Sequence, residues 1–225
     1  MLELQDLSVA IAGIPILRGV TFSVGEGETV AYVGRNGAGK TTTLRAIMGA
    51  VASTGTIRLG GRAIETVPAH ERPGLGIGWA PEDRRLFSAF TVKENILLPA
   101  RVARLDPAER DRRLERVYAI LPELKEMAGR PAGSVSGGQG KMVALGRALM
   151  IGTRLVLLDE PFQGLAPVLA QRYGEALRAL QAADPSLSLL ITESNPALLK
   201  SFADRTIGIE RGEIETAPVL ADPGR

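Results

Sequence analysis

Apolar and polar residues alternate in the first part of the chain, and later segments contain short, continuous apolar runs. Alternation indicates a half-buried strand, and an apolar run bounded by turn residues indicates a strand that is buried on both faces. Glycine-rich turns separate the first of these segments. On this basis we predict strands at residues 2–9, 19–24, 28–33, 56–59, 154–159, 186–192 and 205–210.

Helical patterns occupy most of the chain between these strands. The segment 106–124 opens with Asp106-Pro107, is rich in charge and has apolar residues at helical spacing. Strands that alternate with helices are typical of an α/β protein with a mostly parallel sheet and helices on both faces. The mainly helical stretch from about residue 83 to 150 is predicted to be an inserted subdomain. The predicted helices are residues 43–50, 106–124 and 168–181, and a further one that begins at Ser136.

Composition and charge are those of an ordinary globular protein. Of 225 residues, 45% are hydrophobic and 23% are charged, and the net charge is +2. A dedicated nucleic-acid binder would carry a basic face, so nucleic acid is not an expected partner. There are no cysteines, which excludes disulfides and cysteine-based zinc sites. The N-terminus lacks the basic segment of a secretory signal, and no apolar run approaches the ~20 residues that span a bilayer, so other chains would supply any membrane span.

The segment GRNGAGKT has the strongest link to chemistry. It fits G-x-x-x-x-G-K-[ST], and it follows a predicted strand and precedes a predicted helix. In such a loop the glycines let backbone N–H groups surround phosphates, and the helix N-terminus adds a partial positive charge. Lys40 is expected to reach the β- and γ-phosphates, and Thr41 is expected to place its hydroxyl on Mg²⁺. The predicted nucleotide-binding residues here are Gly34, Arg35, Asn36, Gly37, Ala38, Gly39, Lys40, Thr41 and Thr42.

A second segment, RLVLLDEP, is a predicted buried strand that ends in two carboxylates. Adjacent buried acids are costly unless a cation or water meets them. Asp159 is therefore predicted to hold Mg²⁺, directly or through water, and Glu160 is predicted to polarise an attacking water. The alternative is a strand that runs into an acidic turn with no chemical role.

A third segment, SVSGGQGKMVALGRALM, places a serine and two glycines at a helix start. Such a start offers a hydroxyl, backbone N–H groups and a favourable dipole to an anion. On these residues alone, a simple helix cap by Ser136 is the better interpretation. The segment lies shortly before the Asp159-Glu160 strand, and this order of motifs is more informative than the SGG sequence itself.

In this order the three motifs resemble those of the ATP-binding cassette (ABC) family. GRNGAGKT is similar to its Walker A motif, VSGGQ to its signature motif and LVLLDEP to its Walker B motif. The resemblance implies one ABC ATPase domain over residues 1–225, with an α/β P-loop core, an N-terminal antiparallel β subdomain and a helical subdomain near 83–150. It also implies a head-to-tail dimer in which the signature serves the partner's nucleotide. The residues that would do so are Ser136, Gly137, Gly138 and Gln139.

A closer resemblance is to the ATP-binding subunit of branched-chain amino acid importers and their urea and amide relatives. The segments TTTLRAIMG, PEDRRLFSAFTVKENILLPA and DEPFQGLAP carry it. Glu82 stands where most ABC proteins have a glutamine, and we assign it to both the catalytic and the metal-binding residues. The segment 84–95, with Phe87 and Phe90, would form the surface that receives a helix of the membrane partner. Ordinary core packing of the two phenylalanines is the alternative.

The resemblance also implies cofactors, partners and a location. ATP and Mg²⁺ are the expected cofactors. Membrane permease subunits and a second ABC ATPase subunit are the expected partners, with a substrate-binding protein as an indirect one. The second subunit is expected to be a different, homologous chain, and a second copy of this chain is the alternative. The chain would lie peripherally at the cytoplasmic face of the cell membrane.

Several positions depart from the family pattern. Ile11 stands where relatives usually have an aromatic residue that stacks on adenine, so we expect looser adenine binding. A stacking partner is commonly worth about 0.5–1.5 kcal/mol beyond area burial. Tyr32 is not expected to replace it, because it lies inside a predicted strand. In the signature, Val135 replaces a leucine, and Lys141 adds a cation whose effect on the nucleotide stays open.

The largest departure is Ser194, just after the predicted strand 186–192. Most relatives have a histidine there that contacts the γ-phosphate and helps to position Glu160 and water, and the branched-chain subgroup often has a glutamine. A serine hydroxyl is neutral and shorter. His70, the single histidine, lies far away in sequence and is not expected to substitute. We therefore expect slow hydrolysis at this subunit's own site, unless Ser194 acts through water or a partner compensates.

The leading hypothesis is an ATPase subunit that powers an importer of branched-chain amino acids or related small amino acids and amides. One alternative is a nucleotide-binding subunit with a slow or degenerate site of its own in a heterodimer. Another is a soluble, non-transport ABC ATPase in translation or DNA maintenance. That class carries two cassettes in one chain or long coiled coils, and neither is present in this sequence.

Overall fold

The computed structural model describes residues 1–200 and 202–215. The chain divides into two compact units. The terminal unit consists of Met1–Arg72 and Ser188–Arg225, and the central unit consists of Pro73–Leu187. Within the described residues, no helix combines the length and the apolar character that a membrane crossing requires.

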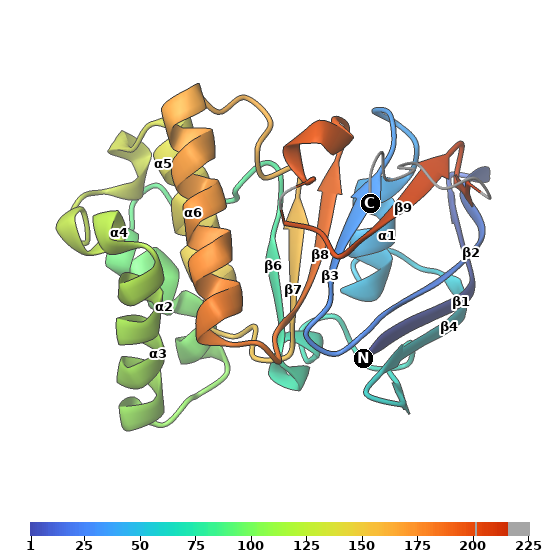
Figure 1. The fold of residues 1–225 in the computed structure, drawn as a ribbon. Helices are drawn as coiled ribbons and strands as arrows, with labels where there is room; N and C mark the ends of the chain where they lie inside the picture. The colour runs from blue at the N-terminus through green and yellow to red at the C-terminus, as the bar shows by residue number, and fades with distance from the viewer. Residues whose placement is uncertain (201, 216–225) are drawn as a thin grey trace. The chain divides into compact units, whose positions relative to one another are not determined.

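The terminal unit contains an antiparallel sheet with the strand order β2-β1-β4-β5. Figure 1 labels β2, β1 and β4 of this sheet. In this sheet Leu2 of β1 lies opposite Val24 of β2 on one side and Leu59 of β4 on the other. Leu2 and Leu4 are buried and Glu3 between them is exposed, which is the expected alternation of a half-buried strand. The register shifts between Leu4 and Leu7, and this irregularity lets Leu7 be buried as well although it is three residues further on. The strands are β1 Leu2–Ile11, β2 Ile14–Val24, β4 Thr54–Leu59 and β5 Arg62–Ala63.

Parallel strands of the terminal unit lead to the predicted phosphate loop. β3 lies between β8 and β9 and is parallel to both, and β10 pairs antiparallel with β9. Every residue of β3 and β8 is buried, which explains why their apolar runs are nearly continuous. These elements are β3 Thr29–Val33, α1 Lys40–Ile47, β8 Ser188–Glu193, a 3₁₀ turn at Pro196–Leu198, β9 Arg205–Glu210 and β10 Glu213–Ile214.

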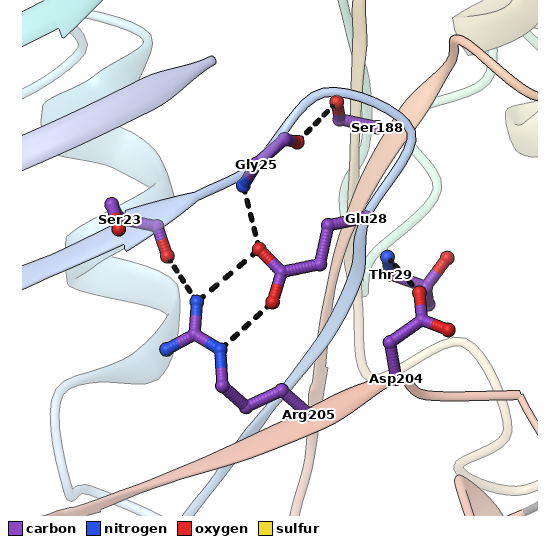
Figure 2. Close-up of polar contacts among 7 residues, drawn as sticks. All are labelled: Ser23, Gly25, Glu28, Thr29, Ser188, Asp204 and Arg205. Atoms are coloured by element: carbon purple, nitrogen blue, oxygen red, sulfur yellow. Dashed lines mark hydrogen bonds and ion pairs between the residues drawn. The ribbon is translucent and has the colours of Figure 1, made fainter.

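A polar cluster holds the start of β3 to the starts of β8 and β9 (Figure 2). Arg205 donates from Nε to one carboxylate oxygen of Glu28 at 2.8 Å and from Nη2 to the other at 3.2 Å. Hydrogen bonding to the Arg205 side chain is the main reason that the pKa of the Glu28 carboxyl is lowered. Arg205 also donates to the carbonyl of Ser23 at 2.6 Å, and Ser188 Oγ donates to the carbonyl of Gly25 at 2.8 Å. The start of β3, the strand that leads to the phosphate loop, is therefore held to the starts of β8 and β9.

The central unit combines two parallel strands with a group of helices (Figure 1). β6 and β7 pair with Ile77 opposite Leu155. Helix α5 buries most of its residues and therefore lies inside this unit rather than on its surface. A 3₁₀ turn at Arg72–Leu75 begins at the last residue of the first segment of the terminal unit and leads into the central unit. The elements of the central unit are β6 Ile77–Ala80, α2 Val92–Val102, α3 Pro107–Ile120, α4 Pro122–Glu126, a 3₁₀ turn at Ala132–Ser134, α5 Gly137–Leu149, β7 Leu155–Asp159 and α6 Pro167–Ala183.

The predicted α/β fold class is confirmed, and each predicted strand and helix overlaps an observed one. The single helix predicted at 106–124 is wrong in one respect, because it is divided into α3 and α4. Pro122 has no N–H to continue the hydrogen bonds of α3 and instead begins α4. The sequence pattern did not indicate β6, and it placed α2 only within the mainly helical stretch 83–150, without predicting its bounds. Residues 92–149 contain α2 to α5, and we propose that this part of the chain acts as the helical subdomain.

Arg72 anchors the C-terminal end of α1 and is only 4% exposed. Its Nη1 donates to the carbonyls of Ala46 and Ile47 at 2.8 and 2.7 Å. Its other nitrogens donate to the carbonyls of Val67 and Glu65 at 2.9 and 3.0 Å. Because the Arg72→Met substitution removes the donor from these carbonyls, we expect it to lower the free energy of unfolding by about 2–4 kcal/mol.

Urea unfolding followed by circular dichroism measures this loss. Arg58→Met is a matched control because it removes an exposed guanidinium from β4. It should change the free energy of unfolding by less than about 0.5 kcal/mol. Equal stabilities of the two variants would contradict the anchoring role of Arg72.

Candidate functional site

The loop between β3 and α1 is the predicted phosphate-binding segment. Gly37 and Gly39 have φ angles of 82° and 115°, in the region that favours glycine. Lys40 is only 5% exposed. Its Nζ donates to the carbonyls of Gly34 at 2.5 Å and Arg35 at 3.2 Å. The loop therefore curves around the ammonium group that would meet a phosphate.

The start of α1 is suited to an anion. Its first turn contains no acidic residue, and the helix dipole places a partial positive charge there. Arg35 and Asn36 are exposed at the tip of the loop, and Thr41 and Thr42 are half-buried in the first turn of the helix. The phosphate-binding residues predicted from the sequence thus form one continuous loop and helix start in the terminal unit.

Ser194 lies beside the start of the phosphate loop. In the parallel pair of β3 and β8, Val33 lies opposite Glu193, and the N–H of Gly34 donates to the carbonyl of Glu193 at 3.2 Å. Glu193 is buried, and the next residue, Ser194, is exposed. Ser194 also lines a cavity of about 220 Å³ together with Gly34 and Arg35. The structure therefore brings Ser194 to the loop near which the sequence predicted a γ-phosphate contact.

Asp159 and Glu160 stand at the end of β7 in the central unit and are 2% and 3% exposed. Glu160 has a φ angle of 47°, a left-handed conformation that costs a non-glycine residue about 1–2 kcal/mol. The Nζ of Lys141 donates to the carbonyl of Glu160 at 2.5 Å. Two adjacent buried carboxyl groups and an unfavourable backbone conformation are more typical of a functional site than of a plain strand end.

Glu82 is exposed and lies just beyond the end of β6. The residues that follow it include Arg84 and Arg85, with φ angles of 61° and 46°. Arg147 of α5 donates to the carbonyls of Arg84 at 2.5 Å and Arg85 at 2.7 Å. Burial lowers the pKa of the Arg147 guanidinium. Helix α5 therefore holds the backbone that follows Glu82.

Ser136 caps α5. Its Oγ accepts a hydrogen bond from the N–H of Gln139 at 3.2 Å, and the side-chain oxygen of Gln139 accepts one from the N–H of Ser136 at 3.0 Å. Gly138 lies against α6 so closely that a Cβ would be 2.4 Å from a methyl carbon of Leu169. Ser136 and Gly137 are both exposed. The helix cap that these residues favoured on their own is therefore present, and the cap leaves the helix start accessible.

The remaining candidate positions differ in exposure. Ile11 is 46% exposed near the end of the β1–β2 hairpin. Tyr32 is completely buried in β3, so it belongs to the core. Phe87 is 52% exposed and stacks on Phe90 with ring centroids 5.4 Å apart, so at least Phe87 is not a core residue. His70 is exposed and lies in the terminal unit.

The residues that fit Mg²⁺ are oxygen donors. In the part of the chain that the structure describes, no three acidic, histidine or cysteine side chains form a ready-made metal site. Mg²⁺ in phosphate chemistry usually takes one or two protein oxygens and completes its octahedron with substrate phosphates and water. In the terminal unit the hydroxyl of Thr41 is an oxygen donor of this kind, and in the central unit the buried carboxyl of Asp159 is another.

Lys141 and Arg147 make contacts that the sequence did not reveal. The sequence indicated Lys141 only as a cation in the signature segment, and it gave no role to Arg147. Both are half-buried within a helix whose other residues from 142 onward are buried. A basic residue inside such an apolar run is the signal that could have identified them, because buried charges are usually paired with a specific acceptor.

Comparisons with known proteins identify the family of this chain. Residues 17–163 match the sequence profile of the family described as ABC transporter. The high-affinity branched-chain amino acid transport ATP-binding protein BraG of Pseudomonas aeruginosa is 36% identical over 100% of this chain and 93% of its own length. The lipopolysaccharide export system ATP-binding protein LptB of Acidithiobacillus ferridurans is 33% identical over 96% of this chain and 89% of its own.

Among solved structures, the ADP conformation of an ATP-binding cassette of an ABC transporter matches this fold. The TM-score is 0.83 at 26% identity, over 96% of this chain and 89% of that one. The family profile covers both the phosphate loop and the Asp159-Glu160 pair, and BraG and LptB align over nearly the whole chain. The chain therefore belongs to the ABC transporter family.

Proposed function

We propose that this chain is the ATP-binding and ATP-hydrolysing subunit of an importer for branched-chain amino acids or related small amino acids and amides. By family and fold it is an ABC ATPase. The observation that carries the narrower proposal is the 36% identity to BraG over the whole chain. The identity to LptB, an export protein, is nearly as high, so percent identity gives only a small preference for import. The stretch Gly164-Leu165-Ala166-Pro167 after Walker B resembles that of the amino acid importers and is a second reason to favour import.

In the terminal unit, Lys40 and Thr41 would bind the phosphate end of ATP. The Lys40 ammonium already donates to the loop carbonyls of Gly34 and Arg35. Phosphate oxygens are themselves charged and would accept the same donor in stronger bonds. The Thr41 hydroxyl would bind Mg²⁺, which would neutralise charge on the β- and γ-phosphates. Ile11, exposed and apolar, would contact the adenine.

In the central unit, Asp159, Glu160 and Glu82 would carry the remaining roles. Asp159 would hold Mg²⁺, and Glu160 would orient the attacking water and accept its proton. Burial of both side chains supports this assignment, because a general base acts best where bulk water is excluded. Glu82, at the carboxyl end of β6, would contact Mg²⁺ and the water.

The same unit would make the contacts with partner chains. Ser136, Gly137, Gly138 and Gln139 would bind the nucleotide of a second ABC ATPase subunit, and the exposed helix start at Ser136 supports this. The exposed ring of Phe87 would contact a membrane permease subunit. This contact would hold the chain peripherally at the cytoplasmic face of the membrane, with a substrate-binding protein acting through the permease.

Co-expression with neighbouring permease and binding-protein genes tests the proposed function. Proteoliposomes that contain the complex should hydrolyse ATP faster when the binding protein carries leucine, isoleucine, valine or a small amide. Stimulation by the aliphatic amino acids would support import of that class. Stimulation by lipopolysaccharide, with no response to amino acids or amides, would overturn the importer assignment in favour of export.

Ser194→His should raise the rate of ATP hydrolysis by at least about tenfold, because an oriented donor at a transition state is commonly worth about 10²–10³ in rate. Ser194 lines the same cavity as Gly34, but its hydroxyl is neutral and short. An imidazole at the same position would reach farther into the site. Steady-state turnover of the two proteins, measured side by side, checks the expectation.

Ser186→His is the matched control for this substitution. Ser186 is exposed and precedes β8, so an imidazole there should leave the rate unchanged. An unchanged rate for Ser194→His, with Glu160→Gln inactive, would mean that Ser194 does not limit hydrolysis.

A second candidate is that this chain is the slower subunit of a heterodimer. The observation that favours it is the serine beside the phosphate loop. The family resemblance implies a histidine at this position. A homologous partner with a histidine at this position would then carry out most of the hydrolysis. Purification of the chain with only its own copies, at full transport activity, would rule out this candidate.

A further inference from the structure

Lys141 and Glu160 are joined by a contact that the roles proposed above do not use. Lys141 lies near the start of α5, and Glu160 follows the last residue of β7, both in the central unit. The Nζ of Lys141 donates to the backbone carbonyl of Glu160 at 2.5 Å in a partly buried setting. A hydrogen bond from a charged donor is roughly twice as strong as a neutral one.

The backbone of Glu160 needs stabilising contacts. Its φ angle of 47° is unfavourable for a residue with a Cβ, and such conformations persist only where the surrounding structure enforces them. The Glu160 carbonyl also accepts the N–H of Gln163, at a longer 3.3 Å. The bond from Lys141 comes from a charged donor, so it stabilises this conformation more than the neutral bond from Gln163 does.

The backbone conformation of Glu160 sets the direction of its side chain. A change of φ to the helical or extended region would rotate the Cα–Cβ bond and carry the carboxylate with it. A general base must lie within hydrogen-bond reach of the proton it accepts. A displacement of about 1 Å at a reacting group can cost on the order of 10²-fold in rate.

We propose that Lys141 is a positioning residue for Glu160. By binding the Glu160 carbonyl, Lys141 keeps the Glu160 carboxylate pointing toward the water that it would polarise. This inference rests on the role proposed above for Glu160. Helix α5 then both presents Ser136 at its start and holds Glu160 through Lys141. The competing explanation is that the Lys141 cation acts directly on nucleotide charge.

The substitution Lys141→Met keeps the apolar stem and removes the donor. It should lower kcat for Mg-ATP hydrolysis by about 10- to 100-fold and leave KM for ATP within about twofold. Lys141→Arg keeps a cationic donor and should restore most of the rate. Lys125→Met is the control, because it removes an exposed ammonium from α4 and should change neither constant.

A double-mutant cycle with Glu160→Gln separates positioning from a general structural effect. If Lys141 acts through the Glu160 carboxylate, Lys141→Met should not lower the residual single-turnover rate of Glu160→Gln any further. A loss of the same size in both backgrounds would overturn the proposal. The Tm of each variant shows that it is folded. If Lys141→Met is not, the milder Lys141→Gln takes its place in the cycle.

The other outcomes are equally decisive. A raised KM with an unchanged kcat would mean that the cation acts on the nucleotide, which would overturn the positioning role. A fully active Lys141→Met beside an inactive Glu160→Gln would overturn the role of Lys141 alone. An active Glu160→Gln would instead overturn the proposed role of Glu160, and the role of Lys141 would fall with it.

Discussion

Glu160→Gln should lower the single-turnover rate of ATP hydrolysis by about 10²–10⁴-fold, which is the usual contribution of a positioned general base. Glutamine has nearly the same shape as glutamate but cannot accept a proton from water. The neighbouring Asp159 is unchanged, so Mg-ATP should still bind with nearly wild-type affinity. Rapid-quench measurement of phosphate release, together with titration of a fluorescent ATP analogue, separates the two effects.

Glu126→Gln is the matched control for this substitution. Glu126 is exposed at the end of α4, so its loss should leave the rate unchanged. Retained hydrolysis in Glu160→Gln would contradict the assignment. The next candidate for the base would then be Glu82, the exposed carboxylate beyond β6, and Glu82→Gln would have to show the loss instead.

Lys40→Met should lower kcat/KM for Mg-ATP by about 10³-fold, because it removes both a charge-assisted bond to the bound phosphates and charge stabilisation at the transition state. Lys40 is almost fully buried, so its bonds are poorly screened by solvent. Nucleotide affinity and hydrolysis should therefore both fall, in contrast to Glu160→Gln. Titration of the ATP analogue and steady-state turnover measure the two parts.

Arg45→Met is the control for Lys40→Met. Arg45 lies on the same helix but is exposed in its last turn, away from the phosphate loop. Its removal should leave affinity and turnover nearly unchanged. Equal effects of the two substitutions would mean that loss of charge from the terminal unit, rather than the position of Lys40, causes the defect.

The elements that could be predicted from the sequence are those whose pattern is complete within the segment. β3 and β8 are buried throughout, and their apolar runs identified both. β6 was missed because Ile77–Ala80 is too short to show a period. The division between α3 and α4 was missed because apolar residues continue at helical spacing across Pro122.

The parts of the candidate site that could be predicted from the sequence are likewise those contained within one segment. The phosphate loop and the Asp159-Glu160 pair are contiguous motifs, so the order of residues along the chain is enough to recognise each of them. The prediction for Ser194 required an alignment by resemblance, and the structure places this residue beside Gly34 and Arg35. That neighbourhood follows from the parallel pairing of β3 with β8, strands that are separated by most of the chain.

The sequence by itself determined the chemistry of the motifs, because the spacing of their residues along the chain also sets their spacing in space. Only the tertiary structure decided which side chains support them from a distance. Lys141 reaches the carbonyl of Glu160, Arg147 reaches those of Arg84 and Arg85, and Arg72 reaches the end of α1. In each case a long cationic side chain binds a backbone oxygen. Every residue carries such an oxygen, so no sequence pattern indicates which one will be bound until packing brings the two together.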